Sequence, residues 1–302
     1  MKRPRPPSRA RLHDDNTTSL ALYHRTSQAA AAAVLGRYST SFGSGARLLG
    51  PRMRTHIRSI YAMVRVADEI VDTYRGADAR DVLEGFEREV HRAMETSFSA
   101  NLVAHAFALT ARQVGIGRDV TEPFFASMRM DVDATAHTQA SFDRYVYGSA
   151  EVIGDMCLAV FVSTDNGPGE ASPAVREGAR RLGAAYQKIN FLRDLAMDEG
   201  QLGRCYFPGV TAASITDDTL RDLVEDCRAD MRAAEDCLAA LPRRARIAVA
   251  TTIDIYSRLL EQIAATPASR LCDERLRVAN PMKAVLALRN ACPWLSFTRR
   301  AA

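Results

Sequence analysis

Long segments with the 3.6-residue hydrophobic period of an α-helix fill most of this sequence, and glycine and proline fall mainly between them. Alternating runs of β-branched residues, which indicate strands, are scarce. The chain has 302 residues, 47% of them hydrophobic, and no internal linker rich in serine or glycine, so we expect a single all-α domain. The predicted helices cover residues 26–36, 51–75, 79–97, 101–114, 120–131, 141–162, 173–198, 217–240, 242–265 and 280–290.

The beginning of the chain differs from the rest. Five basic residues and three prolines lie in its first eleven positions with no apolar run behind them, which argues against a secretion signal. We expect a disordered basic arm over 1–18 and a helical domain over 19–302. No stretch of eighteen uninterrupted apolar residues offers a membrane span, and the six cysteines are scattered, as reduced thiols are. These features predict a cytoplasmic protein, whose contact with a membrane would be peripheral.

One predicted helix has a polar stripe on an otherwise apolar surface. Tyr61, Arg65, Asp68 and Asp72 stand at i, i+4, i+7 and i+11, so they share one face at 3.6 residues per turn. The positions between them are almost all alanine, valine, isoleucine or methionine, and a helix so apolar should be buried. Because buried carboxylates are costly unless a cation neutralises them, this stripe predicts a bound cation.

A second helix repeats the arrangement, with Gln187, Asn190, Asp194 and Asp198 at i, i+3, i+7 and i+11. Two such stripes on facing helices would surround several cations with carboxylates. Oxygen ligands favour Mg²⁺, Mn²⁺ or Ca²⁺ over zinc, and Mg²⁺ in particular keeps substrate phosphates among its ligands. The expected substrate is therefore phosphorylated. The alternative is that each aspartate pair lies on a solvated helix face, where such pairs are commonest.

The two acidic segments, 68–72 and 190–198, resemble the paired aspartate-rich motifs of the squalene and phytoene synthase family. Three other segments look like family elements in the same order: 38–42, 145–154 and 203–208, the last reading Gly-Arg-Cys-Tyr-Phe-Pro. The resemblance covers most of the chain. It implies an isoprenoid synthase helical bundle, in one domain, around a central apolar cavity.

The resemblance also implies roles for individual residues. The implied metal ligands, for Mg²⁺ with Mn²⁺ as a substitute, are Asp68, Asp72, Asn190, Asp194 and Asp198. The residues implied to act beside the metal, with the arginines as diphosphate contacts, are Tyr61, Arg65 and Arg193. The residues implied to bind the substrate are Ser39, Ser41, Phe42, Ala46, Tyr147, Gln187, Tyr256 and Arg277.

Several of these residues also fit structural roles. The two serines could instead cap the helix that follows them. Tyr256 could belong to the core, and Arg275 could take the part of Arg277. Glu151 stands where the family usually has a small residue, and we expect it to face outward or to support its neighbours rather than to add a ligand.

By this resemblance, the chain is expected to be a prenyl-transferring enzyme of carotenoid biosynthesis. It would join two geranylgeranyl diphosphates head to head, through prephytoene diphosphate, to phytoene. The alternative is a C30 dehydrosqualene or squalene synthase that uses farnesyl diphosphate. Ala46 lies four residues after Phe42 and favours the longer substrate, because a bulky side chain there would shorten the cavity. No glycine-rich dinucleotide motif is present, so no nucleotide cofactor is expected.

Three other classes of protein fit the sequence less well. A head-to-tail chain-elongating synthase would show Asp-Asp-x-x-Asp in both motifs, and the second motif lacks it. A noncatalytic assembly factor would have lost acidic ligands, whereas all four aspartates remain. A nucleic-acid-binding protein would concentrate arginine along one helix face, but the dense cluster here is confined to the first eleven residues.

Overall fold

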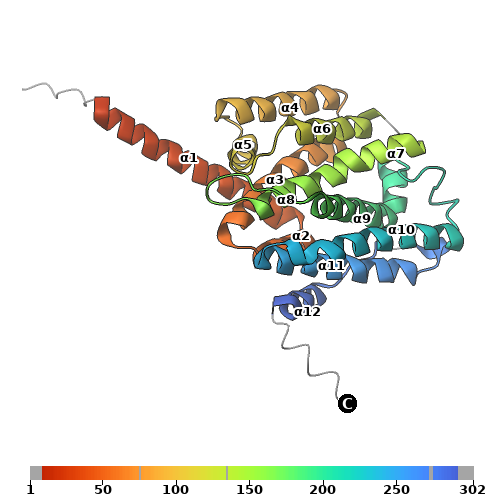
Figure 1. The fold of residues 1–302 in the computed structure, drawn as a ribbon. Coiled ribbons are helices and arrows are strands. Elements are labelled where there is room, and N and C mark those ends of the chain that lie inside the picture. The colour runs from red at the N-terminus through yellow and green to blue at the C-terminus, as the bar shows by residue number, and fades with distance from the viewer. Residues whose placement is uncertain (1–8, 75, 134, 272–274, 292–302) are drawn as a thin grey trace, which may run out of the picture.

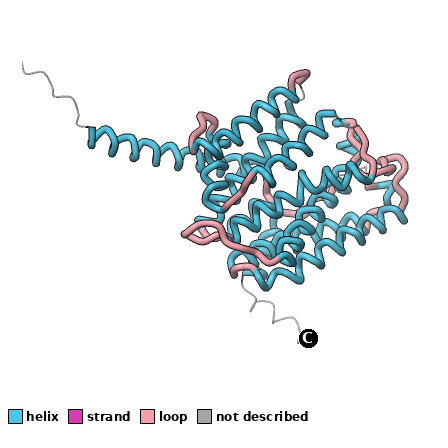
Figure 2. Tube along the Cα trace, turned by 45° about the horizontal axis from the view of Figure 1, so that its top comes forward, coloured by secondary structure: helices cyan, strands magenta, loops and turns pink. Residues whose placement is uncertain are grey.

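The protein is built from α-helices, as the periodicity predicts. The computed structural model describes residues 9–74, 76–133, 135–271 and 275–291, and within these ranges it contains no β-strand (Figure 2). The α-helices are α1 (Arg9–Tyr38), α2 (Ser41–Leu48), α3 (Pro51–Glu69), α4 (Ala79–Thr96), α5 (Leu102–Val114), α6 (Arg118–Asp133), α7 (Gln139–Val146), α8 (Val152–Val162), α9 (Pro173–Met197), α10 (Asp217–Cys237), α11 (Arg243–Ala264) and α12 (Asn280–Ala291).

The first helix begins earlier than expected, and its N-terminal half extends away from the bundle (Figure 1). The chain is helical from Arg9, where a disordered arm was expected as far as residue 18, and residues 1–8 lie outside the described ranges. The reason is local: after Pro7, neither proline nor glycine interrupts the sequence until Gly36. The C-terminal half of α1 packs on α3 and α5, where Ala31 and Leu35 are buried.

Helices α3 and α9, which contain the two acidic stripes, lie within the bundle (Figure 1). α3 packs against α1, α5 and α8, and α9 packs against α8, α10 and α11. α2 lies on α11 and α12, which together cover one side of the molecule. This arrangement places the two predicted stripes on neighbouring layers of the bundle.

Glycines let the central helices approach one another closely. A Cβ atom at Gly148 would stand 2.2 Å from the backbone oxygen of Pro123 in α6, and a Cβ atom at Gly183 would stand 2.3 Å from that of Ala150. Real Cβ atoms essentially never come so near, so only glycine permits these backbone contacts. The segment from Tyr147 to Glu151 is thereby fixed between α6 and α9.

The segment from Gln139 to Val162, which joins α7, a π-helical turn and α8, has the length and mean hydropathy (1.4) of a membrane span. In the structure, 56% of its apolar window is buried inside the bundle. Its apolar character therefore matches that of a core helix of which more than half is buried.

Two local features differ from the predicted helices. The short helix α2 occupies a segment that was not predicted as a helix. Each acidic stripe ends in a π-helical turn, Ile70–Tyr74 after α3 and Asp198–Leu202 after α9, and a third π-helical turn spans Tyr147–Glu151. Such turns are frequent at functional sites because they displace side chains from the regular α-helical positions.

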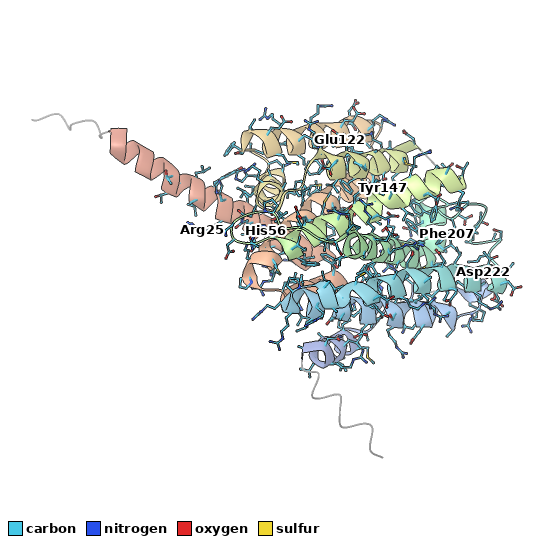
Figure 3. All side chains as sticks on the ribbon, viewed as in Figure 1. Arg25, His56, Glu122, Tyr147, Phe207 and Asp222 are labelled. Carbon is cyan, nitrogen blue, oxygen red and sulfur yellow. The ribbon has the colours of Figure 1, made fainter. Side chains whose placement is uncertain are left out.

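The buried His56 should make the fold sensitive to acid. It lies within the bundle (Figure 3), its Nδ1 atom is 3.0 Å from the hydroxyl of Thr110, and burial, assisted by Arg52, lowers its pKa from 6.5 to about 4. Between those two pH values only the unfolded chain takes up the proton, so stability falls as the pH is lowered.

We predict that His56→Gln reduces this acid sensitivity. Wild-type protein should lose roughly 3 kcal/mol more of its unfolding free energy between pH 7 and pH 4 than the variant does. Urea denaturation at a series of pH values measures the difference. Parallel pH profiles for the two proteins would contradict the assignment.

Candidate active site

A cavity of about 870 Å³ runs through the bundle. Tyr61, Arg65 and Asp68 of the first stripe and Gln187 and Asn190 of the second line it, as does Arg193. The other stripe members, Asp72, Asp194 and Asp198, are not among the lining residues. The rest of its wall is largely apolar, with aliphatic side chains from α2, α3, α8, α9 and α11. The cavity therefore has a charged end, near residues of both stripes, and a long apolar interior.

The first stripe presents a carboxylate that is difficult to ionise. Burial, together with the nearby charge of Asp72, raises the pKa of Asp68 to about 8. Arg65 forms an ion pair with Glu69 and lies 3.9 Å from Asp68, while its Nε atom has no partner among the described residues. Burial raises the pKa of Tyr61 to about 12, so its phenol stays protonated at neutral pH.

One carboxylate of the second stripe is in a similar state. Burial and the charges of Asp194 and Asp72 raise the pKa of Asp198 to about 7. Asp194 is paired with two arginines: Arg193 Nε lies 3.0 Å and Arg275 Nε 2.7 Å from its Oδ1 atom. The Oδ1 atom of Asn190 is buried and has no hydrogen-bond partner within the described part of the chain.

The two stripes lie at the same end of the cavity. Asp68 from the first and Asn190 from the second both line it, and the charge of Asp72 from the first contributes to the raised pKa of Asp198 from the second. Arginine side chains occupy part of the space between the carboxylates, because Arg204 Nη1 lies 2.5 Å from Asp72 Oδ1. Among the described residues, no three acidic, histidine or cysteine side chains form a ready-made metal cluster.

The donor set nevertheless suits a hard cation. Carboxylate oxygens and a carboxamide oxygen are the ligands that Mg²⁺ prefers. Burial and the charges of neighbouring carboxylates raise the pKa of Asp68 and Asp198, and a bound cation would offset both effects. The Oδ1 atom of Asn190 has no hydrogen-bond partner among the described residues, so it is a further oxygen that a cation could use as a ligand. The predicted ligands that could hold Mg²⁺ are therefore Asp68, Asp72, Asn190, Asp194 and Asp198.

The residues predicted to bind substrate near α2 line the cavity. These are Ser39, Ser41, Phe42 and Ala46. Ser39 Oγ accepts a hydrogen bond of 3.1 Å from the backbone N–H of Phe42, so it also caps the start of α2, as the alternative interpretation has it. The Phe42 ring stacks on Tyr61 with ring centroids 5.6 Å apart.

Three of the four remaining substrate predictions also lie on the cavity wall. They are Gln187, Tyr256 and Arg277. Tyr256 is stacked on Tyr186 with ring centroids 3.9 Å apart, so it is both a packed residue and a cavity residue. Arg275 and Arg277 both line the cavity, and Arg275 reaches Asp194.

Tyr147 lies elsewhere. It is on the central π-helical turn (Figure 3), is not among the residues that line the cavity, and has the Arg180 guanidinium 5.7 Å from its ring centroid. Glu151 on the same turn is half-buried, and its charged neighbours are Arg180, Glu177, Asp230 and Lys188. These belong to α9 and α10 and not to the acidic stripes, which matches the expected supporting position.

Sequence reasoning missed a buried network behind the first stripe. Asp131 of α6 accepts hydrogen bonds from the hydroxyls of Tyr145 (2.8 Å) and Tyr206 (3.1 Å). Arg204 lies 3.7 Å from Asp131 and also donates to the backbone oxygen of Val71 at 2.9 Å. The network thus fixes the position of the arginine that pairs with Asp72. A signal was present, because Asp131 follows Phe124 and Met128 at i+7 and i+3 on the buried face of its helix.

A second missed residue is Lys283 of α12. It is only 7% exposed, lines the cavity, and donates a 2.8 Å hydrogen bond to the hydroxyl of Thr40. Burial and the charges of Arg193 and Arg277 lower the pKa of its ammonium group. Three cations facing one another need an anion to offset their repulsion.

Comparison with known sequences agrees with this geometry. Residues 35–281 match the squalene/phytoene synthase family. The chain belongs to this family. A 15-cis-phytoene synthase of Enterobacter agglomerans is 26% identical to this family member over 288 residues, which cover 87% of this chain and 94% of that protein. A presqualene diphosphate synthase of Sinorhizobium fredii is 29% identical over 240 residues, covering 76% of this chain and 80% of that protein.

Solved structures share the fold of this squalene/phytoene synthase family member. A dehydrosqualene synthase in complex with ligand superposes with a TM-score of 0.77 at 20% identity, over 91% of this chain and 98% of that chain. A squalene synthase from Alicyclobacillus acidocaldarius gives a TM-score of 0.70 at 17% identity, over 80% and 94%. The expected single-domain, all-α synthase fold is confirmed.

Removing the carboxylate at the centre of the buried network should destabilise the protein. We predict that Asp131→Ala lowers the unfolding free energy by about 3 kcal/mol or more, because it removes the buried acceptor of two tyrosine hydroxyls and one of the two carboxylates beside Arg204. The matched control is Asp133→Ala on the same helix, whose 55% exposed carboxylate pairs with Arg80 at the surface. That change should cost less than about 1 kcal/mol. If urea denaturation gave equal losses of unfolding free energy for the two variants, the buried network would contribute no more to stability than a surface ion pair.

Proposed function

We propose that this protein joins two geranylgeranyl diphosphates head to head, with Mg²⁺, to form phytoene. One observation carries the proposal: at one end of a single cavity lie Arg65 and Asp68 from α3 and Asn190 and Arg193 from α9, and the wall along the rest is largely apolar. That division matches an amphiphile with a diphosphate head and a long hydrocarbon tail. Relatives named phytoene synthase, from bacteria and from Zea mays, support the choice of product.

The charged end is suited to holding diphosphate groups. Arg65 lines the cavity and its buried Nε–H has no partner among the described residues, and Lys283, Arg193 and Arg277 form a group of cations that line the same cavity. Guanidinium groups bind phosphate oxygens through charge-assisted hydrogen bonds. We assign the diphosphates to this end, with Ser39 as a neutral donor.

Bound Mg²⁺ would supply charge neutralisation for a departing diphosphate, and the five oxygen-bearing ligands named above would hold it. Loss of that diphosphate leaves an allylic cation, which the C2=C3 bond of the second prenyl chain attacks. Loss of a proton then gives a cyclopropylcarbinyl diphosphate. After the second diphosphate leaves, rearrangement and a further proton loss give the linear hydrocarbon.

The side chains around the cavity would protect this chemistry. Apolar residues of α2, α3 and α8 exclude water that would otherwise capture a carbocation as an alcohol. The phenol of Tyr61, protonated and stacked on Phe42, presents an aromatic face and a neutral hydroxyl near the charged end. The released diphosphate and the carboxamide of Asn190 are candidate proton acceptors.

A second candidate is a C30 synthase that acts on farnesyl diphosphate. It is favoured by the 29% identical relative named presqualene diphosphate synthase and by the fold neighbour described as a dehydrosqualene synthase. The two candidates share the site and differ in the length of hydrocarbon that the cavity accepts.

Incubation of the purified protein with Mg²⁺ and radiolabelled C20 or C15 diphosphate, followed by hydrocarbon extraction, tests the proposal. We expect a C40 hydrocarbon from the C20 substrate, no product after chelation of the metal, and recovery with Mg²⁺ or Mn²⁺. Asp68→Asn and Asp194→Asn should each lower turnover roughly 100-fold or more while leaving the circular dichroism spectrum unchanged. The exposed Asp222→Asn on α10 is the matched control. A near-normal rate for either site variant would remove it from the metal site.

Ala46 allows a prediction about chain length. It is 5% exposed, lines the cavity, and lies beside Gly45, which is in close contact with Thr252 of α11. A phenylalanine there would fill the space between α2 and α11. We predict that Ala46→Phe lowers kcat/KM for the C20 diphosphate at least 10-fold relative to the C15 diphosphate. An unchanged preference would exclude Ala46 as a determinant of length.

A further inference from the structure

The cavity extends far along α9, well beyond the acidic residues. Asn190 and Arg193 line its charged end, and Val175 and Gly178, near the beginning of the same helix, line its other end. The fifteen residue steps from Val175 to Asn190, at 1.5 Å each, span about 22 Å. Residue positions along α9 therefore indicate how far a bound hydrocarbon of a given length would reach into the cavity.

Prenyl chains of different length should end beside different residues of α9. An extended C20 chain has about 16 main-chain carbons joined by about 15 bonds and, at about 1.2 Å per bond as in an extended peptide, measures roughly 18 Å; a C15 chain, with about 11 such bonds, measures roughly 13 Å. With its first carbon level with Asn190, the C20 chain ends beside Gly178. The C15 chain ends near Leu182, one helical turn earlier.

Small side chains surround the point that only the longer chain reaches. Gly178 is buried, Ala234 of α10 is 5% exposed, and both line the cavity together with Cys237. A Cβ atom at Gly178 would lie 3.0 Å from Cys237 Sγ, so α9 and α10 approach closely here. Cys237 is itself fixed by a 3.3 Å hydrogen bond from its thiol to the backbone oxygen of Ala174.

We propose that Gly178, Ala234 and Cys237, the far-end pocket, bind the fourth isoprene unit of a C20 substrate and so select it over a C15 substrate. This inference rests on the proposed function and deepens it. It assigns a length determinant between α9 and α10, separate from Ala46 between α2 and α11. Because a C15 chain ends a turn short of the far-end pocket, filling that pocket affects only the longer substrate.

The test compares Ala234→Leu with Ala229→Leu, a matched change at an exposed position of the same helix. Binding of non-hydrolysable thiolodiphosphate analogues of both lengths is measured by calorimetry, and initial rates are measured with both diphosphates. We expect Ala234→Leu to weaken binding and lower kcat/KM for the C20 compound at least 10-fold, with changes under about 3-fold for the C15 compound. Ala229→Leu should leave both unchanged.

Cys237→Leu provides a second variant at the same pocket, in case Ala234→Leu does not fold, and should give the same selective loss. A wild-type protein that binds neither analogue and converts neither diphosphate would overturn the proposed function and this inference together. A wild-type protein that uses both, with variants whose C20 to C15 ratio is unaltered or whose losses are equal, would overturn the far-end pocket alone.

Discussion

The structure depends on how the protein tolerates several carboxylates at one end of an apolar cavity. Burial and the charge of Asp72 raise the pKa of Asp68 on the same stripe and contribute to the raised pKa of Asp198 on the other. Arginines offset the repulsion: Arg204 pairs with Asp72, while Arg193 and Arg275 pair with Asp194. In a medium of low dielectric constant such pairs interact strongly, so the arginines help the acidic end to remain compact.

The same pairing connects distant parts of the chain to the site. Arg204 follows the π-helical turn at the end of α9, yet its guanidinium lies on the first stripe, and Asp131 and Tyr206 hold it there. Asp131 belongs to α6, and none of the described residues of that helix lines the cavity. The geometry of the acidic end is therefore set by side chains that do not face the cavity.

Much of this could be predicted from the sequence because it depends on local periodicity. The spacing of Asp68 and Asp72, and of Asp194 and Asp198, identified both stripes, since residues on one helix face stay together whatever the tertiary fold. The role of Arg204 could not be derived in this way. Its partners Asp72 and Asp131 lie 132 and 73 positions away in the sequence, and no residue near Arg204 indicates which they are. The π-helical turns were also missed, since their cause is tertiary contact and not the pattern of apolar residues.

The glycine contacts have a further consequence for how this cavity can change. Gly183 of α9 lies against the backbone of Ala150. Gly154 of α8 lies equally close to α9, because a Cβ atom placed on it would stand 2.3 Å from the backbone oxygen of Ala179. Where two main chains touch, no side chain lies between the helices to be enlarged or trimmed, so their separation is fixed. Evolution or design can therefore alter the accepted molecule through the side chains that line the cavity, but not by changing the distance between the helices at these contacts.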